Sequence, residues 1–126
     1  MTKITFIGAG SIEFTKNLLG DILTFPELQD CTISLHDIDP VRLQTAEAMA
    51  RWTAKALGAT PTIEAHLDRK KALDGADYAI NMIQVGGHAA TLIDFDIPRK
   101  YGVKQTIGDS HSIGGIVRAV IRKYGV

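Results

Sequence analysis

The sequence is poor in the residue types that build extracellular, membrane-spanning or metal-rich proteins. Cys31 is its only cysteine, so no disulfide can form within the chain and no cysteine cluster can hold zinc or an iron–sulfur centre. Its apolar runs are too short to span a bilayer, and the first leads directly into a glycine turn instead of a signal-peptide cleavage site. We therefore expect a cytoplasmic protein with no membrane partner.

The chain also lacks an excess of charge of either sign. Fourteen Lys and Arg balance fourteen Asp and Glu in 126 residues, so binding to the phosphate backbone of nucleic acids is not expected. Aromatic residues are few, at 6%, whereas hydrophobic residues make up 45%. This length and composition predict one domain, residues 1–126, with a buried parallel sheet covered by helices.

Strand-like and helical segments alternate along the chain. Apolar runs rich in strand-forming residues predict strands at residues 4–7, 32–35, 62–67 and 77–84. The first helical segment carries a predicted buried stripe of Phe14, Leu18, Ile22 and Leu23. The alternation predicts an α/β fold of the Rossmann-like, doubly wound type, with helices on both faces of a sheet of order 3-2-1-4. Lys104–Ile107 is a candidate fifth strand.

A glycine turn joins the first strand to the first helix. Gly8 and Gly10 let the backbone approach a pyrophosphate, and the following helix directs its positive end at that charge. Ser11 is a candidate cap for this helix, and Ile12 follows it. Glu13 stands where the usual pattern has a third glycine, so the assignment needs support from other residues.

An acidic residue at the end of the second strand gives that support. Asp37 can accept hydrogen bonds from both hydroxyls of an adenosine ribose and would repel a 2′-phosphate, which favours NAD over NADP. We group the neighbouring Ile38 with it as cofactor-binding. The alternative is that Asp37 or Asp39 only caps the next helix, and Asp39, just before Pro40, is the better cap. Arg42 is a weak argument for some NADP tolerance.

Two further loops are candidate binding segments. Gln84, Val85 and Gly86 follow the fourth strand, at the carboxyl edge where such sheets bind ligands, although an ordinary tight turn would also explain them. Asp109 lies ahead of the last helix, where it could hold a sugar hydroxyl or merely cap that helix. The four histidines show no metal-ligand spacing.

A short repeat marks the end of the chain. Arg99–Val103 recurs as Arg122–Val126. The repeat is explained if two helices end with the same signal, basic residues followed by glycine. It is equally explained if the C-terminus was copied from an existing helix end.

Together these segments resemble the family-four glycoside hydrolases, above all their α-galactosidase and α-glucuronidase branch. The similar segments follow in the same order over nearly the whole chain: residues 4–11, 17–21, 37–40, 83–87, 105–109 and 114–119. The resemblance implies an N-terminal Rossmann domain that binds NAD, followed by a domain that binds a divalent metal, usually manganese. It also implies a glycosidase in which the bound NAD oxidises the sugar C3 hydroxyl, which makes the C2 proton acidic. The glycosidic bond is then eliminated, water adds, and the ketone is reduced again.

Site residues are implied by the same resemblance. Its motifs match the pyrophosphate turn at Gly8, Gly10, Ser11 and Ile12, the ribose carboxylate at Asp37, the cofactor loop at Gln84, Val85 and Gly86, and a residue near the substrate at Asp109. The family's metal-binding cysteine and histidine and its catalytic tyrosine lie downstream, so this chain is assigned no catalytic and no metal residue.

We therefore expect an NAD-binding domain that is not catalytic alone, with the family's catalytic domain absent and a C-terminus that is truncated or redesigned. Two alternatives stay open: an enzyme whose other half is supplied separately or that acts as a minimal dehydrogenase, and a ligand-free scaffold. We also expect a homodimer formed through the C-terminal region, unless residues 117–126 seal that edge and keep the chain monomeric.

Overall fold

The structure is a computed structural model that describes residues 1–104, 117 and 120–121. The chain divides into two compact units, Met1–Met82 and Ile83–Val126. The elements of the first unit are, in order, β1 (Lys3–Ile7), α1 (Ile12–Thr24), the 3-10 helix η1 (Pro26–Leu28), β2 (Thr32–His36), α2 (Pro40–Leu57), β3 (Thr62–His66), α3 (Arg69–Leu73) and β4 (Tyr78–Asn81). The second unit contains α4 (Gly87–Lys100).

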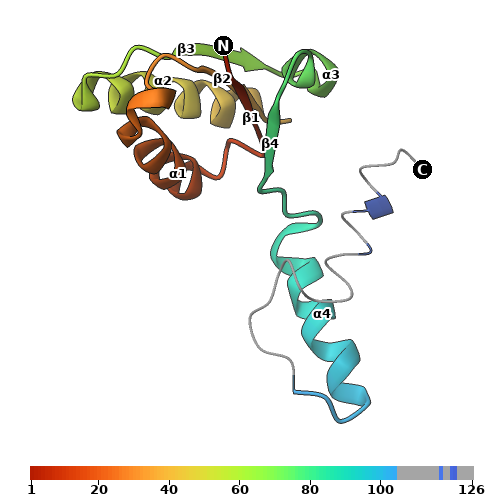
Figure 1. Ribbon diagram of the computed structural model, residues 1–126. Helices are drawn as coiled ribbons and strands as arrows, with labels where there is room; N and C mark the ends of the chain where they lie inside the picture. The colour runs from red at the N-terminus through yellow and green to blue at the C-terminus, as the bar shows by residue number, and fades with distance from the viewer. Residues whose placement is uncertain (105–116, 118–119, 122–126) are drawn as a thin grey trace. The chain divides into compact units, whose positions relative to one another are not determined.

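The strands of the first unit form one parallel sheet in the order β3-β2-β1-β4. Helices α1 and α2 lie side by side on one face of this sheet (Figure 1), and α3 packs on the other. The predicted Rossmann-like fold and strand order are confirmed. The candidate fifth strand, Lys104–Ile107, lies outside the described residues except for Lys104, which belongs to no strand.

One face of the sheet supplies the hydrophobic core. The register places Ile4 beside Ile33 and Phe6 beside Leu35, so these side chains share a face, and all are buried. The two covering helices bury leucines and alanines against them: Leu19, Leu23, Leu43, Ala46, Ala50 and Ala54. Because alanine is small, α2 can approach the strands closely.

The buried stripe of α1 differs from the predicted one. The helix buries Thr15, Leu19 and Leu23, whereas Phe14 is 64% exposed. Leu23 was correctly placed, but the apolar pattern alone puts Phe14 inside in preference to Thr15. Thr15 gains a buried hydrogen bond there, because its hydroxyl donates to the Ala9 carbonyl at 2.8 Å. That bond ties the first turn of α1 to the glycine turn before it.

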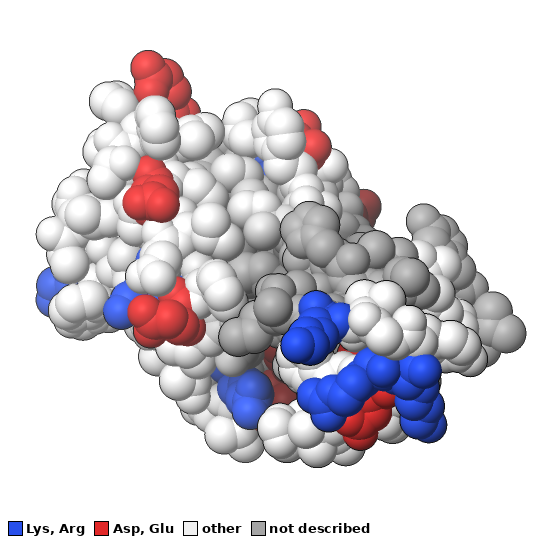
Figure 2. Space-filling model, turned by 90° about the horizontal axis from the view of Figure 1, so that it is seen from below, with Lys and Arg blue, Asp and Glu red and all other residues white. Residues whose placement is uncertain are grey.

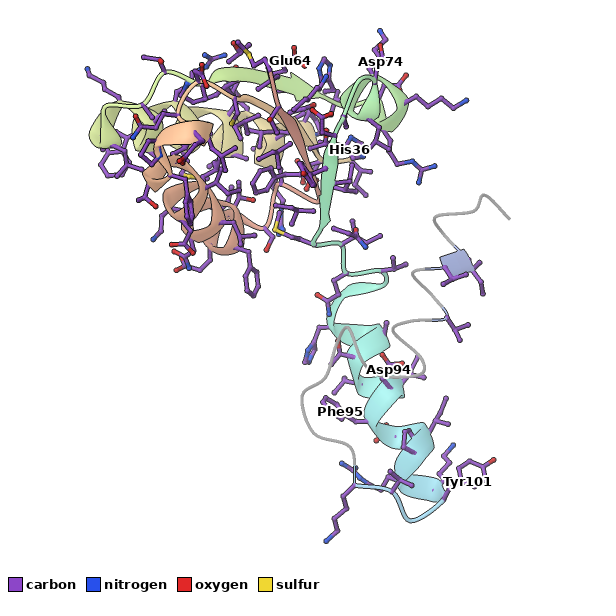
Figure 3. The ribbon with its side chains drawn as sticks, viewed as in Figure 1. His36, Glu64, Asp74, Asp94, Phe95 and Tyr101 are labelled. Atoms are coloured by element: carbon purple, nitrogen blue, oxygen red, sulfur yellow. The ribbon has the colours of Figure 1, made fainter. Side chains whose placement is uncertain are left out.

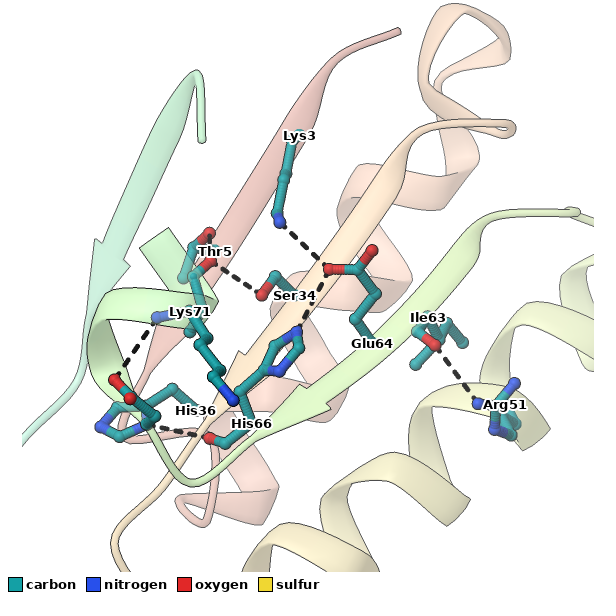
Figure 4. A network of polar contacts seen from close by, with 11 residues as sticks. Lys3, Thr5, Ser34, His36, Arg51, Ile63, Glu64, His66 and Lys71 are labelled. Carbon is teal, nitrogen blue, oxygen red and sulfur yellow. Dashed lines mark hydrogen bonds and ion pairs between the residues drawn. The ribbon is translucent and has the colours of Figure 1, made fainter. Parts of the chain in front are cut away.

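The opposite face of the sheet is polar where α3 packs on it. The hydroxyls of Thr5 and Ser34 are fully buried, and each donates to the carbonyl of Ala72 at 2.9 Å (Figure 4). Ala72 lies in the last turn of a five-residue helix, where carbonyls have no partner within the helix. The two strand hydroxyls therefore satisfy an acceptor that would otherwise be buried unpaired.

An ion-pair network crosses this polar face. Glu64 on β3 accepts from the Lys3 ammonium at 3.0 Å and lies 3.3 Å from Nε2 of His66 (Figure 4). The hydrogen bond from Lys3, and then that from His66, holds the pKa of Glu64 below its ordinary value. His36 on β2 donates from Nδ1 to the His66 carbonyl at 3.0 Å, which links the second and third strands beyond the backbone ladder.

The second unit is described by one long helix. α4 begins after Gly86, whose φ of +92° favours glycine, and its first intrahelical bond runs from the Ala90 amide to the Gly86 carbonyl. Figure 3 shows Phe95 and Tyr101 projecting from this helix and its C-terminal end. In the part of the chain that the structure describes, no helix is long and apolar enough to cross a membrane.

The network around Glu64 predicts a pH-dependent contribution to stability. Replacing Glu64 by Gln should lower the free energy of unfolding at neutral pH by at most about 1 kcal/mol, because a side chain that is 36% exposed is screened by water. Since the native-state pKa of Glu64 is lowered, this stability is present above the unfolded value, near 4.5, and is lost as the pH falls through the lowered one.

Urea unfolding of the two proteins at neutral and acidic pH measures this difference. Glu27→Gln is the control, because Glu27 is exposed and has no ion pair within the described residues. A Glu64→Gln deficit that persists unchanged at acidic pH would show that the charge is not what stabilises the sheet.

Candidate functional site

The glycine turn is held by the end of the neighbouring strand. The amides of Gly8 and Ala9 both donate to the carbonyl of His36, the last residue of β2, at 2.9 Å. The Ser11 amide returns to the Gly8 carbonyl at 3.0 Å and closes the turn. Gly8 has a φ of +88°, which an L side chain rarely adopts. The first amides of the turn therefore bind the protein itself and are not directed at a ligand.

The amides at the start of α1 are the ones available to a ligand. The first bond within the helix runs from the Thr15 amide to the Ser11 carbonyl, and the amides of Ile12, Glu13 and Phe14 have no acceptor among the described residues. Ser11 is the N-cap residue of α1, as predicted, but its hydroxyl makes no cap hydrogen bond. Free amides at the positive end of a 13-residue helix, beside a free hydroxyl, are suited to an anion.

Glu13 does not block this helix end. Its carboxylate extends along α1, where it lies 3.8 Å from the Lys16 ammonium and accepts a hydrogen bond of 3.5 Å from the side-chain nitrogen Nδ2 of Asn17. Both partners lie one turn further into the helix, so the negative charge is drawn away from the free amides. This position explains how a residue other than glycine is compatible with an anion site.

The carboxylate of Asp37 lies against the second glycine of the turn. Its Oδ2 accepts from the Gly10 amide at 2.7 Å, and its Oδ1 accepts from the Asp39 amide at 2.9 Å. A Cβ on Gly10 would lie 2.5 Å from Oδ2 and 2.9 Å from Cβ of Arg42. Asp37 and Arg42, which follow β2, therefore leave room only for glycine at position 10, whereas the sequence suggested only the close approach of a ligand.

Asp37 and Asp39 have different structural roles. Asp39 caps α2, accepting from the amides of Val41 at 2.9 Å and Arg42 at 3.2 Å. The alternative in which Asp37 caps this helix is therefore wrong, and the preference for Asp39 is confirmed. Each oxygen of Asp37 holds one backbone donor and keeps a lone pair for a further donor, such as a ribose hydroxyl.

Two side chains border this carboxylate. Ile38 is 88% exposed, which makes it an uncovered apolar surface directly beside Asp37. The guanidinium of Arg42, on the first turn of α2, has no partner within the described residues. Neither feature can be seen in the sequence, because exposure and pairing depend on which segments pack nearby.

The remaining predicted residues lie elsewhere. Gln84, Val85 and Gly86 belong to the second unit, where the Gln84 side chain donates to the Thr91 hydroxyl at 3.0 Å and Gly86 is the N-cap of α4. Their predicted place beside the glycine turn stays a prediction. Asp109 lies outside the described residues.

The surface charges, the possible metal ligands and the cysteine limit which reactions the described residues could support. In the lower part of the view in Figure 2, basic side chains stand close to acidic ones, and the acidic side chains in its upper part are surrounded mainly by uncharged surface. No group of three or more His, Cys, Asp or Glu within the described residues could hold a metal ion. Cys31 is buried, and burial raises the pKa of its thiol, which makes the reactive thiolate scarce.

Comparison with known proteins places this site in a family context. Residues 3–123 match the family described as "Family 4 glycosyl hydrolase". The chain is 49% identical over 121 residues to an α-galactosidase of Bacillus subtilis, covering 95% of this chain but 28% of that enzyme. It therefore spans little more than a quarter of the length of such relatives.

Solved structures show the same fold. A 6-phospho-α-glucosidase from gut microorganisms, in complex with NAD and glucose-6-phosphate, has a TM-score of 0.73 at 25% identity over 98% of this chain and 27% of that one. A lactate dehydrogenase of Cryptosporidium parvum shares only the fold, with a TM-score of 0.53 at 18% identity over 82% of this chain and 34% of that one. The chain belongs to family 4 of the glycosyl hydrolases.

Proposed function

We propose that this chain is the NAD-binding part of a family 4 glycosidase. The observation that carries the proposal is the pairing of two ligand-ready groups next to one turn: the free amides at the start of α1 and the Asp37 carboxylate, which Gly10 holds in place. The NAD complex of the 6-phospho-α-glucosidase supports the proposal, because that protein shares the fold over 98% of this chain.

Each half of the dinucleotide has its own partners in this proposal. The pyrophosphate lies over the free amides at the start of α1, beside Ser11 and beginning with the amide of Ile12. Gly8 and Gly10 shape the turn beneath it. Asp37 accepts from both adenosine-ribose hydroxyls, and the exposed Ile38 covers one side of the adenine. Gln84, Val85 and Gly86 are proposed as cofactor contacts and Asp109 as a substrate contact, because they match the motifs of the family.

The charge of Asp37 favours NAD over NADP. A 2′-phosphate would lie against a carboxylate that already holds two backbone donors and cannot move away easily. Arg42, whose Cβ lies close to Gly10 on the first turn of α2, carries a positive charge that would favour the phosphate. The affinity for NADP is therefore expected to be lower than that for NAD but not negligible.

Catalysis by the isolated chain is not part of the proposal. When NAD is bound it supplies a hydride acceptor, and in this proposal the glycine turn, the start of α1 and Asp37, which follows β2, bind and orient it. Manganese is assigned no ligands, because the described residues contain no suitable group of donors. Because the chain spans little more than a quarter of its relatives, glycosidase activity is proposed only for an assembly that supplies the rest. A cytoplasmic location is proposed with it.

Titration of the chain with NAD in a calorimeter separates this proposal from a ligand-free scaffold. Weak but saturable binding is expected. An absence of heat and of thermal stabilisation at millimolar NAD would leave the scaffold as the better description.

Asp37→Ala should weaken NAD binding by roughly 1–3 kcal/mol, because the ribose hydroxyls and the Gly10 amide lose their acceptor. The same variant should narrow the gap between NAD and NADP, since the repulsion of the 2′-phosphate is removed. A purely structural role would weaken both dinucleotides equally.

Asp39→Ala is the matched control for that variant. It removes a carboxylate only two residues away, but one that caps α2, so it should lower the free energy of unfolding by about 1 kcal/mol and leave NAD affinity unchanged. Unchanged NAD affinity in Asp37→Ala would remove Asp37 from the site.

Gly10→Ala tests the close approach of the turn to β2. The added methyl group would displace the Asp37 carboxylate, so NAD affinity should fall at least about tenfold and stability by roughly 1–3 kcal/mol. Gly20→Ala is the comparison, because a Cβ there meets nothing within 4 Å. In the interior of α1 it should stabilise by about 0.5–1 kcal/mol without changing NAD affinity. Equal behaviour of the two variants would contradict the proposed role of Gly10.

The isolated chain should release no phenol from an aryl α-galactoside in the presence of NAD, manganese and a reductant. The reason is the lack of a metal-ligand set within the described residues and of any residue assigned as a base. Manganese-dependent turnover that co-purifies with the chain through successive columns would refute this expectation.

A further inference from the structure

His36 is the last residue of β2, and it is paired with a strand on either side. The register places it beside Ile7 of β1 and beside His66 of β3. The next residue is Asp37, whose carboxylate is the proposed ribose acceptor. The position of the chain at His36 therefore decides where that carboxylate lies.

The imidazole of His36 is buried and has one protein partner that explains its place. The residue is only 6% exposed, and a polar ring that loses water needs a hydrogen bond in compensation. Nδ1 lies 3.0 Å from the carbonyl oxygen of His66 (Figure 4). Because a carbonyl only accepts, Nδ1 carries the hydrogen of this bond. The ring thus attaches the end of β2 to the end of β3.

The backbone of His36 is bonded in the opposite direction, to the glycine turn. Its carbonyl accepts from the amides of Gly8 and Ala9, both at 2.9 Å. One residue later, Oδ2 of Asp37 accepts from the amide of Gly10 at 2.7 Å. A shift of β2 at His36 would therefore displace both acceptors that hold the turn.

We propose that His36 is a positioning residue of the dinucleotide site, whose ring anchors the end of β2 to β3 and thereby sets the place of the Asp37 carboxylate and of the glycine turn. It touches no ligand, and its role rests on the proposed binding of NAD. An aliphatic side chain would fill similar space but would deprive the His66 carbonyl of this donor. Filling the core is therefore not a sufficient reason for histidine at this position.

Two substitutions that remove the Nδ1 donor test the proposal in NAD titrations. His36→Leu has no donor, and His36→Gln carries its amide nitrogen one carbon further out, at the level of Nε2. Each should weaken NAD binding at least about fivefold, because the end of β2 loses its attachment. Urea unfolding of each variant defines conditions under which the protein is fully folded during the titration.

His36→Asn is the conservative variant that should rescue binding. Its amide nitrogen is bonded to Cγ, as Nδ1 is in histidine, so it can donate to the same carbonyl. NAD affinity should equal that of the unaltered chain, even if the smaller side chain lowers stability. A role in packing alone predicts the opposite order, with His36→Leu tolerated better than His36→Asn.

His66→Leu is the matched control on the neighbouring strand. It removes a ring whose Nε2 lies 3.3 Å from Glu64, but it keeps the backbone carbonyl to which His36 donates. Stability should fall, because Glu64 loses a partner, while NAD affinity stays unchanged. This variant separates the loss of a polar side chain on this face of the sheet from the loss of the anchor.

Hydrogen exchange without NAD gives a second measurement that is independent of ligand binding. In His36→Leu the amides of Gly8, Ala9 and Gly10 should exchange at least about tenfold faster, since local opening of the turn becomes easier. Amides within β2, such as that of Leu35, should change much less. Equal acceleration throughout the sheet would show general destabilisation and would contradict the proposed role.

These measurements distinguish the failure of this proposal from that of the proposed function. If the unaltered chain binds no NAD, the proposed function fails and the positioning role fails with it. If the unaltered chain and His36→Leu bind NAD equally well, only the positioning role is refuted. It is also refuted if His36→Asn loses as much affinity as His36→Leu, because the Nδ1 donor is then not what positions the site.

Discussion

The attachment of the glycine turn to the end of β2 is the constraint on which the rest of the site depends. Three consecutive amides of the turn bond to two consecutive residues, the His36 carbonyl and the Asp37 carboxylate. The Asp37 carboxylate and the start of α1 are therefore held in a fixed relation. Without these bonds three amides of the turn would be unpaired, so the position of the free amides of α1 depends on where β2 ends.

The two faces of the sheet are stabilised in different ways. One is covered by the long helices α1 and α2 and uses aliphatic side chains. The other is covered by the short α3, which cannot bury a large apolar surface and whose Ala72 carbonyl has no partner within the helix. The hydroxyls of Thr5 and Ser34 donate hydrogen bonds to that carbonyl, and the ion pairs of Glu64 connect the strands beyond it. The polar residues of β1 and β2 are thus explained by the helix that packs on them.

The strand order, the glycine turn and the cap of α2 at Asp39 could be predicted from the sequence, because they follow from apolar periodicity and local backbone preference. Family membership could be predicted as well, since the motifs stand in order along the chain. Other features arise only from packing in the folded chain. Thr15 replaces Phe14 in the core because its hydroxyl finds the Ala9 carbonyl, and Gly10 must be glycine because Asp37, distant in sequence, occupies the space of a side chain. Such choices depend on which atoms meet across strands and helices, and no local pattern contains that information.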